Sequence, residues 1–413
     1  MRRARSIVCR GTLPARDAVR ALVVVAALAV ITALGSACTE APKPSVTLWH
    51  TYNGSERAAL EAAGDRWNVA HPDTPLTLVA IPYDAFADKL TSAIPAGNGP
   101  DLFIFAHDRL GSWSDAGVLE PIEFWVDDAR ADRFSADAMS QLAYHGSLYG
   151  LPVAEKALAL YYRTDLVATP PATTDALVAL APAMTAKKGF ALAYTNVDLY
   201  GHAPWLHGFG GKVMNDDGSL AIATPEATEA MKFARNLVAT GVSPADAQYP
   251  LVASLFNEGK AATVMMGPWF ITDIAKGVPW AIAPMPIVSA TGLPAVSFAS
   301  TEGVMMSARA HDKDTAFAVM DALTSDVEAI ARARTARQVV ANVHAYDDAG
   351  VAADPALRVF RTQFAHSVPM PKSAAMRVVW TPYKTALGEV ISGRADPGKQ
   401  LLSVADEVGK YLK

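Results

Sequence analysis

The sequence predicts an α/β protein in which parallel strands alternate with helices. One observation is the apolar run Leu102–Ala106, which follows an Asn-Gly-Pro turn at 98–100 and stops at His107. A short run without polar interruption is typical of a strand buried on both faces, as in a parallel sheet. Two earlier strands with helices between them complete a β-α-β-α-β order, which favours a parallel sheet with helices on both faces. The length of 413 residues indicates two domains.

The elements of the first domain follow from strand runs, cap residues and helix-stopping prolines. Ser55 is the candidate N-cap of the first helix, and Pro72 ends that helix. Phe86 and Leu90 are spaced four residues apart, so they should face the core from one side of the next helix. The predicted strands are Val46–His50 and 75–81, and the predicted helices are 55–71 and 84–96.

The second half of the chain repeats this alternation. The stretch 151–162 is extended and is expected to cross into the second domain, and Thr224 followed by Pro225 starts a capped helix. Further strands are expected at 191–195 and Ala261–Met266. Further helices are expected at 174–186, 312–324 and 396–413, and one more helix should begin at Trp380. The chain is expected to cross back between the domains at 296–306 and again at 338–343.

The first 37 residues have the pattern of a secretory signal. Arginines lie at six positions up to Arg20, and 21–34 is an apolar segment of 14 residues, too short to span a bilayer comfortably. The small residues before Cys38 resemble a bacterial lipobox, although Gly35 stands where a bulky residue is usual. This resemblance implies a lipidated Cys38 and a membrane tether at 38–44; the alternative is ordinary secretion with a free Cys38.

Charge and cysteine content exclude several partners and crosslinks. The chain has 36 basic and 41 acidic residues, and removal of the signal leaves 30 and 40, a net charge of about −10. That balance argues against nucleic acid or an anionic membrane surface as the main partner. The only cysteines are Cys9, inside the signal, and Cys38, so the mature chain has no intrachain disulfide.

Common catalytic and cofactor motifs are absent. The chain has no phosphate-binding G-x-x-x-x-G-K-[ST] loop, no G-x-G-x-x-G after a strand, no H-E-x-x-H, no C-x-x-C and no G-x-S-x-G. Its nine histidines are scattered without metal-ligand spacing. We therefore expect no cofactor, no metal site and no catalytic residues.

Polar residues follow the first and third strands at the same edge of the predicted sheet. In open α/β sheets ligands bind just past the carboxyl ends of the strands. Asp108 and Arg109 come directly after Leu102–Ala106, and a carboxylate and a guanidinium can together take several hydrogen bonds from one polar ligand. The alternative is an ion pair that caps the next helix. The loop after the first strand adds weaker candidates, for which a solvated loop is the alternative: Tyr52, Asn53, Ser55 and Glu56.

A second stretch, 256–269, strengthens the ligand hypothesis. It predicts a helix end, a stop at Gly259, a buried strand and a Gly-Pro turn that aims Trp269 outward. Together with 98–122 it resembles the family 1 solute-binding proteins of bacterial sugar importers, closest to the maltose- and maltodextrin-binding members. The resemblance covers nearly the whole mature chain. Further shared stretches lie at 146–152, at 157–162 with Asp165-Leu166, and at Met370-Pro371 with Trp380.

This resemblance implies a two-lobed type II periplasmic-binding fold, each lobe a mainly parallel sheet flanked by helices, with hinge crossings between the lobes. The implied N-terminal lobe is 45–153 with 303–340, and the C-terminal lobe is 154–302 with 341–413. The implied function is non-catalytic: a monomer outside the cytoplasm clamps an oligosaccharide and delivers it to the permease of an ABC transporter. Maltose or maltodextrin is the leading ligand, and trehalose or another oligosaccharide is the alternative. A secreted glycoside hydrolase using Asp108 and Asp198 is the competing class.

The resemblance also implies roles for single residues. Trp269 would be a flat platform under a sugar ring, Tyr200 a second stacking ring, and Asp198 the match of a sugar-binding glutamate. Lys156 stands where the family has another such glutamate, and Glu155 lies one place earlier, on the opposite face of a strand. The remaining implied ligand residues are Phe105, where the closest members have a tryptophan, Met370, Trp380, and Lys384, where the family has an arginine.

Replacement of Cys38 by alanine tests the anchor. A lipid on Cys38 would hold the protein at the membrane, so C38A should move it from the membrane fraction to the soluble fraction in cell fractionation. Mass spectrometry of the wild-type N-terminus is the control. An unmodified Cys38, together with a variant that stays in the membrane fraction, would refute lipidation.

Overall fold

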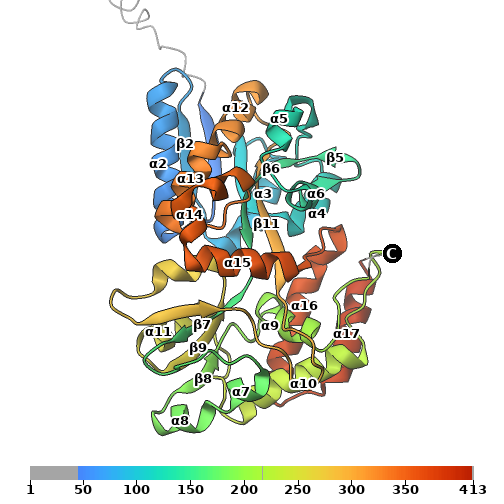
Figure 1. The fold of residues 1–413 in the computed structure, drawn as a ribbon. Helices are drawn as coiled ribbons and strands as arrows, with labels where there is room; N and C mark the ends of the chain where they lie inside the picture. Colours follow the sequence, from blue (N-terminus) through green and yellow to red (C-terminus); the bar gives the residue numbers. More distant parts are fainter. Residues whose placement is uncertain (1–44, 216, 412–413) are drawn as a thin grey trace, which may run out of the picture. The chain divides into compact units, whose positions relative to one another are not determined.

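Two separate β-sheets carry the fold of the computed structural model, which describes residues 45–215 and 217–411 (Figure 1). The predicted signal, Cys38 and the tether lie outside the described residues. Ser45–Lys413 forms one compact unit, and the following sections concern it alone.

The larger sheet confirms the predicted strand order of the first domain. β1 (Val46–His50) pairs in parallel with β2 (Leu76–Ala80) on one side and with β3 (Leu102–Ala106) on the other. β11 (Phe298–Met306) lies antiparallel to β3 and also antiparallel to β6 (Gly150–Lys156). Short β12 (Val368–Pro369) extends the sheet beyond β11.

The smaller sheet differs from the expected mainly parallel arrangement. Its strands are ordered β10 (Trp280–Ala283), β7 (Ala159–Arg163), β9 (Ala261–Met266) and β8 (Phe190–Ala193). Only β8 and β9, which are joined through intervening helices, are parallel; β7 is antiparallel to both of its neighbours. The helices between β8 and β9 supply the long crossover that a parallel pair requires.

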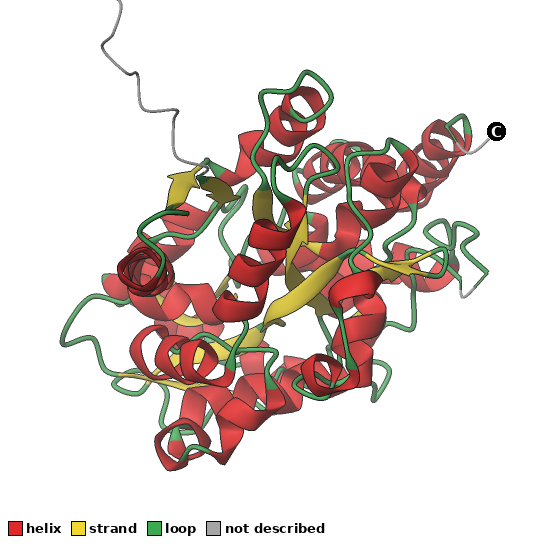
Figure 2. Ribbon diagram, turned by 90° about the horizontal axis from the view of Figure 1, so that it is seen from above, coloured by secondary structure: helices red, strands yellow, loops and turns green. Residues whose placement is uncertain are grey.

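Helices pack around each sheet (Figures 1 and 2). Those in the first part of the chain and around the larger sheet are α2 (Gly54–Ala70), α3 (Tyr83–Ala93), α4 (Leu110–Asp115), α5 (Asp128–Ala131), α6 (Ala136–Gln141), α12 (Lys313–Leu323) and α13 (Asp326–Ala336). The others are α7 (Thr174–Val178), α8 (Ala181–Ala186), α9 (Leu199–Gly208), α10 (Pro225–Ala239), α11 (Tyr249–Asn257), α14 (Ala349–Ala353), α15 (Pro355–His366), α16 (Ala374–Ile391) and α17 (Pro397–Gly409). A small hairpin pairs β4 (Ala143–Tyr144) with β5 (Ser147–Leu148).

Alternating side chains of β3 serve two different cores. Leu102 and Ile104 pack in the core that includes α2 and α12, whereas Phe103 and Phe105 pack in the core that includes Phe86 of α3. This is the pattern of a strand covered on both faces, since successive side chains point to opposite sides of a sheet. The prediction of a doubly buried strand is therefore confirmed.

Several helix boundaries differ from the sequence predictions. The first helix begins at Gly54 with Asn53 in the N-cap position, so Ser55 is not its cap; Gly54 has a φ of 52°, which suits glycine. The predicted 174–186 helix is two helices, α7 and α8. Trp380 does not open its helix, because α16 begins at Ala374.

The chain passes from the larger sheet to the smaller one within the predicted crossing segment 151–162. β6 remains hydrogen-bonded to the larger sheet as far as Lys156, and β7 begins at Ala159 in the smaller sheet. β11 belongs to the larger sheet from Phe298 onward. The segment around Val339 runs beside β6, where the Glu155 amide donates to the Val339 carbonyl at 2.7 Å. In the described part of the chain, no helix combines the length and the apolar character needed to cross a membrane.

Candidate functional site

The candidate site lies at one edge of the larger sheet, where the predicted polar residues meet. The loop carrying Tyr52 follows β1, and residues 107–109 follow β3 as a 3₁₀ turn. β11 runs in the opposite direction and places Glu302 directly across from Ala106, the last residue of β3. Lys156 ends β6, on the other side of β11. Four segments that are distant in the sequence therefore present polar side chains at one edge.

His107 fixes this edge to the C-terminal part of the chain. The imidazole is fully buried; its Nδ1 accepts from the Thr301 amide at 3.1 Å, and its Nε2 donates to the Met370 carbonyl at 2.9 Å. Burial lowers the pKa of His107 to about 4, so the ring is neutral near pH 7. The side chain of Met370 is itself buried, and its backbone serves as the anchor.

One carboxylate oxygen of Asp108 accepts a hydrogen bond within the described part of the protein, and the other does not. Its Oδ2 accepts from the Trp380 indole Nε1 at 3.1 Å and lies 3.3 Å from Nε of Arg109. Its Oδ1 is buried and has no hydrogen-bond partner among the described residues. Burial raises the pKa of Asp108 to about 6, against the opposing effects of Arg109 and Trp380. Buried acceptors normally have a partner, so this oxygen marks a place for a donor.

Aromatic rings from the second half of the chain face the same place. Trp269 is half-buried after the Gly267-Pro268 turn, and its ring lies 6.2 Å from that of Tyr200 at an interplanar angle of 48°. A Cβ on Gly267 would lie 2.0 Å from the Trp269 ring, so only glycine permits this placement. The Tyr200 hydroxyl is buried and also has no partner within the described chain.

Asp198 is both a helix cap and a neighbour of the site. It is the N-cap of α9, and its Oδ1 accepts from the Tyr200 amide at 2.7 Å. Burial raises the pKa of Asp198, while the exposed Lys384 on α16 acts to lower it. The helix-cap role explains why the carboxylate is held rigidly beside Tyr200.

Lys156 is buried among acidic and aromatic side chains. Its Nζ lies 2.5 Å from Oε1 of Glu56 and 3.6 Å from Oε2 of Glu302. It also lies 5.6 Å from the centre of the Tyr52 ring and 5.8 Å from that of Trp269. Burial lowers the pKa of Lys156, but Glu302 and Glu56 together outweigh that effect and raise it. The ammonium is therefore charged and paired, as a buried cation requires.

Three predicted residues lie apart from this convergence. Glu155 is on the opposite face of β6, where Arg361 lowers its pKa but burial dominates and raises it to about 8. Phe105 is a core residue stacked between Tyr83 and Phe86, at 5.3 Å and 5.0 Å between ring centres. Asn53 is exposed at the start of α2. The structure thus brings together Glu56, Asp108, Arg109, Lys156, Asp198, Tyr200, Trp269 and Trp380, with Lys384 beside Asp198.

Sequence reasoning missed two residues of the site, Tyr83 and Glu302. Tyr83 begins α3, stacks on Phe105 and is 61% exposed; Asp108, Asp198, Glu302 and Tyr200 lie near enough to influence its ionisation. Tyr83 follows β2 at the same sheet edge as Asp108, and this position in the sequence could have identified it as a candidate. No sequence signal identifies Glu302, because its place depends on the antiparallel pairing of β11 with β3.

The charges at the site nearly cancel. The acidic groups are Glu56, Asp108, Asp198 and Glu302, and the basic groups are Arg109, Lys156 and Lys384. A site with nearly balanced charge favours a neutral, polar ligand over a strongly charged one, because a charged ligand would leave buried charge uncompensated. Among the described residues, no group of three or more His, Cys, Asp or Glu side chains is placed to hold a metal ion.

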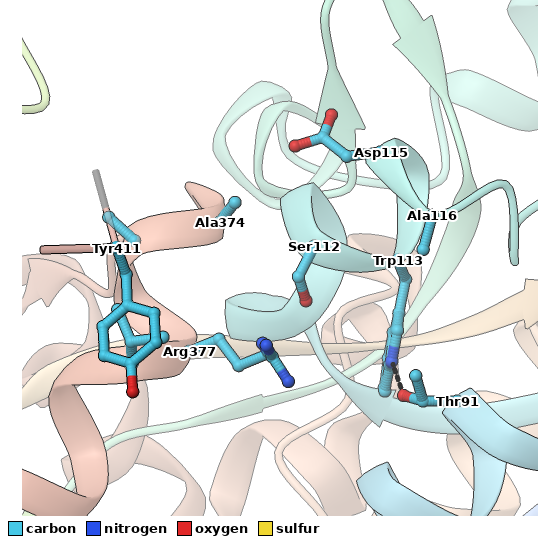
Figure 3. Close-up of a pocket in the computed structure, with 10 residues that line it drawn as sticks. Thr91, Ser112, Trp113, Asp115, Ala116, Ala374, Arg377 and Tyr411 are labelled. Carbon is cyan, nitrogen blue, oxygen red and sulfur yellow. Dashed lines mark hydrogen bonds between the residues drawn. The ribbon is translucent and has the colours of Figure 1, made fainter. Parts of the chain in front are cut away.

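A surface hollow of about 430 Å³ lies next to this site but is lined by other residues (Figure 3). Thr91, Ser112 and Trp113 border it on one side, and Arg377 of α16 and Tyr411 on the other. Trp113 Nε1 donates to Thr91 Oγ1 at 3.0 Å and is thereby satisfied. None of the buried polar atoms that lack a hydrogen-bond partner among the described residues lines this hollow. We therefore place the site at Asp108 and Tyr200, which carry two such atoms.

Comparisons with known proteins show the family to which the chain belongs. Residues 53–330 match the model of the bacterial extracellular solute-binding protein family. A maltotriose-binding protein of Pyrococcus abyssi is 27% identical over 377 residues, which cover 89% of this chain and 82% of that protein. A maltooligosaccharide ABC transporter solute-binding lipoprotein of Streptococcus pneumoniae is 25% identical and is matched over 75% of each chain.

A solved structure extends the similarity to the fold. The Thermus thermophilus maltotriose-binding protein bound with maltotriose has a TM-score of 0.83 and 25% identity, and the match covers 89% of this chain and 100% of that one. The fold and the site thus define a two-lobed α/β binding protein of the type II periplasmic class. The chain belongs to the bacterial extracellular solute-binding protein family.

Glu155 gives a test that is independent of ligand. Because its pKa is raised to about 8 in the folded protein, the folded state holds a proton that the unfolded state releases above its ordinary pKa of 4.5. Stability should therefore fall as pH rises between these values. Glu155→Gln should remove this slope and raise Tm at pH 8 more than at pH 5, measured by thermal unfolding. The matched control, Glu229→Gln, concerns an exposed acid and should change neither value appreciably. Equal shifts at both pH values would contradict the buried, protonated state.

Proposed function

We propose that the chain is the extracytoplasmic sugar-binding component of an ABC importer, and that it binds maltotriose- or maltodextrin-like oligosaccharides between its two lobes. The observation that carries the proposal is the convergence of Trp269, Tyr200 and Tyr83 with Asp108, whose Oδ1 is buried without a partner. The names of the Pyrococcus abyssi and Streptococcus pneumoniae relatives support the ligand class and the transporter.

Each side chain has a physical role in this proposal. The C–H face of a pyranose ring stacks on the indole of Trp269, while its hydroxyls point outward. A hydroxyl can donate to Asp108 Oδ1 or Tyr200 Oη, whose own partners are otherwise lacking. The near balance of charge suits a neutral sugar. Lys384 and Arg109 can donate to further hydroxyls from the rim.

The lobe assignment belongs to the same proposal. The N-terminal lobe would be 45–153 with 303–340, and the C-terminal lobe 154–302 with 341–413. Closure around a ligand is the expected motion of such a hinge. The Trp380–Asp108 hydrogen bond and the His107–Met370 contact join the two lobes as assigned, and they support a closed arrangement. We further propose that the protein acts as a monomer, without catalysis, and is held at the membrane by lipid on Cys38.

Titration with sugars tests this function directly. The purified mature protein is titrated with maltose, maltotriose and trehalose by tryptophan fluorescence and calorimetry. Saturable quenching with recovery of intact sugar is expected, and a ligand at about 100 times its Kd should stabilise the fold by roughly 2.7 kcal/mol. Preference for trehalose would support the alternative ligand, and appearance of shorter sugars would support a hydrolase using Asp108 and Asp198.

Replacement of Trp269 tests the platform. Trp269→Ala should weaken maltotriose binding by about 1–3 kcal/mol, because both stacking and apolar burial are lost. Calorimetry measures the affinity, and a melting curve checks the fold. Trp125→Ala is the matched control, since Trp125 is half-buried, stacks on Phe317 and lies in the N-terminal lobe as proposed. Equal losses in both variants would argue against a platform role.

The pH dependence of binding tests Asp108. If ligand hydroxyls donate to its carboxylate, the ligand binds the ionised form, and protonation of the free protein below a pKa of about 6 competes with binding. Affinity should be constant above this pH and fall below it, by up to tenfold per pH unit. Asp108→Asn should bind more weakly, and the step near pH 6 should be missing from its profile. Parallel profiles for the two proteins would remove Asp108 from the ligand contacts.

A further inference from the structure

We propose that Glu302 is the ligand-binding carboxylate on this side of the cleft, and that Lys156 is a positioning residue that holds Glu302 and does not itself contact the sugar. This inference rests on the proposed function, and it concerns the specificity of the same site. It replaces the expectation that Lys156 faces the ligand directly.

The exposure of the three charged side chains gives their order from core to cleft. The side chains of Lys156 and Glu56 are 5% and 7% exposed, whereas that of Glu302 is 14% exposed. Glu302 is also the one whose charge reaches the Tyr83 and Tyr200 hydroxyls. Glu302 is therefore the most exposed of the three, and it lies toward Tyr83 and Tyr200, whereas Lys156 Nζ is enclosed between Glu56 and the Tyr52 and Trp269 rings.

Glu302 also has hydrogen-bonding capacity to spare. Its Oε2 accepts from the Tyr52 hydroxyl at 2.9 Å and lies 3.6 Å from Lys156 Nζ. Among the described residues, the hydrogen bond and the ion pair of Glu302 are both made by Oε2, so Oε1 remains able to accept a hydrogen bond. A carboxylate with one oxygen anchored and the other open can accept from a sugar hydroxyl in a fixed direction.

The Lys156 ammonium is already engaged by carboxylates of the protein. Its ammonium lies 2.5 Å from Glu56 Oε1, an oxygen that also accepts from Gln338 Nε2 at 3.2 Å. Glu56 is thereby held on the core side, and Lys156 bridges it to Glu302. One lysine thus contacts two carboxylates, Glu56 on the core side and Glu302 beside Tyr52.

The backbone explains why Glu302 can take this place. β11 pairs with both β3 and β6, and its register with β6 shifts between Glu302 and Gly303. The extra residue of this bulge is Val153 of β6, and beyond it Ala154 lies opposite Glu302, so that Lys156, two residues further on, is on the same face of the sheet as Glu302. A Cβ on Gly303 would lie 2.6 Å from Leu142, so the glycine allows the close packing beside it. An acceptor at the sheet edge is thus supplied from β11, next to the lysine of β6.

Glu302→Gln is the first test, with maltotriose as the probe. The amide keeps the shape of the side chain but lacks its charge, so affinity should fall on the order of ten- to a hundredfold. Glu120→Gln is the matched control, because Glu120 is also partly buried and pairs with a lysine, Lys313, at 2.7 Å. It should bind as the wild type does. An unchanged affinity of Glu302→Gln would overturn the inference while leaving the proposed function intact, whereas a wild-type protein that binds no sugar would overturn both.

A mutant cycle tests the role of Lys156. Lys156→Met alone would leave Glu56 buried without its cation, so the cycle uses the paired change Glu56→Gln with Lys156→Met, checked by its melting curve. If Lys156 acts through Glu302, adding Glu302→Gln to this pair should weaken binding much less than it does in the wild type. Independent, additive losses would mean that Lys156 contacts the sugar itself, and the positioning role would be wrong.

Discussion

The pairing of β11 with both β3 and β6 is the constraint on which the site depends. β11 is antiparallel to both β3 and β6, so its amino-terminal half lies at the same edge as the carboxyl ends of β1, β3 and β6. Thr301 and Glu302 therefore reach His107 and Lys156 from a segment that is about 150 residues away from Lys156 in the sequence. Without this strand, His107 would lose its hydrogen bond to the Thr301 amide, and the polar residues after β3 would have no carboxylate from β11 beside them.

Burial then decides the electrostatics of that edge. Asp108, Asp198 and Glu302 all have a raised pKa with burial as the largest cause, so each carboxylate depends on nearby cations and donors to remain ionised. Each carboxylate has a cation nearby: Arg109 is beside Asp108, Lys384 is near Asp198, and Lys156 is between Glu56 and Glu302. Such pairing makes the cleft polar but nearly neutral, which matches a ligand with many hydroxyls and no charge.

Much of the N-terminal half could be predicted from local pattern. The strands at Val46–His50 and Leu102–Ala106 have the predicted bounds, and Phe86 and Leu90 are fully buried, because apolar runs and helical spacing act over a few residues. The convergence of Asp108 with Trp269 and Trp380 rested on the family resemblance. Boundaries were less predictable: Ser55 is inside its helix, and α16 begins a turn and a half before Trp380, where neither position has a strong competing signal.

The sequence by itself determined the α/β class, the family, the strand that precedes Asp108 and the turn that carries Trp269. These depend on periodicity, on turn-forming glycine and proline, and on motifs read in order. Only the tertiary structure decided that Lys156 pairs with Glu56, that Glu155 lies on the opposite face of β6, and that Glu302 lies across from Ala106 and beside Lys156. The physical reason is that these facts depend on register between strands distant in sequence, and a change of one residue in register reverses the face to which every side chain points.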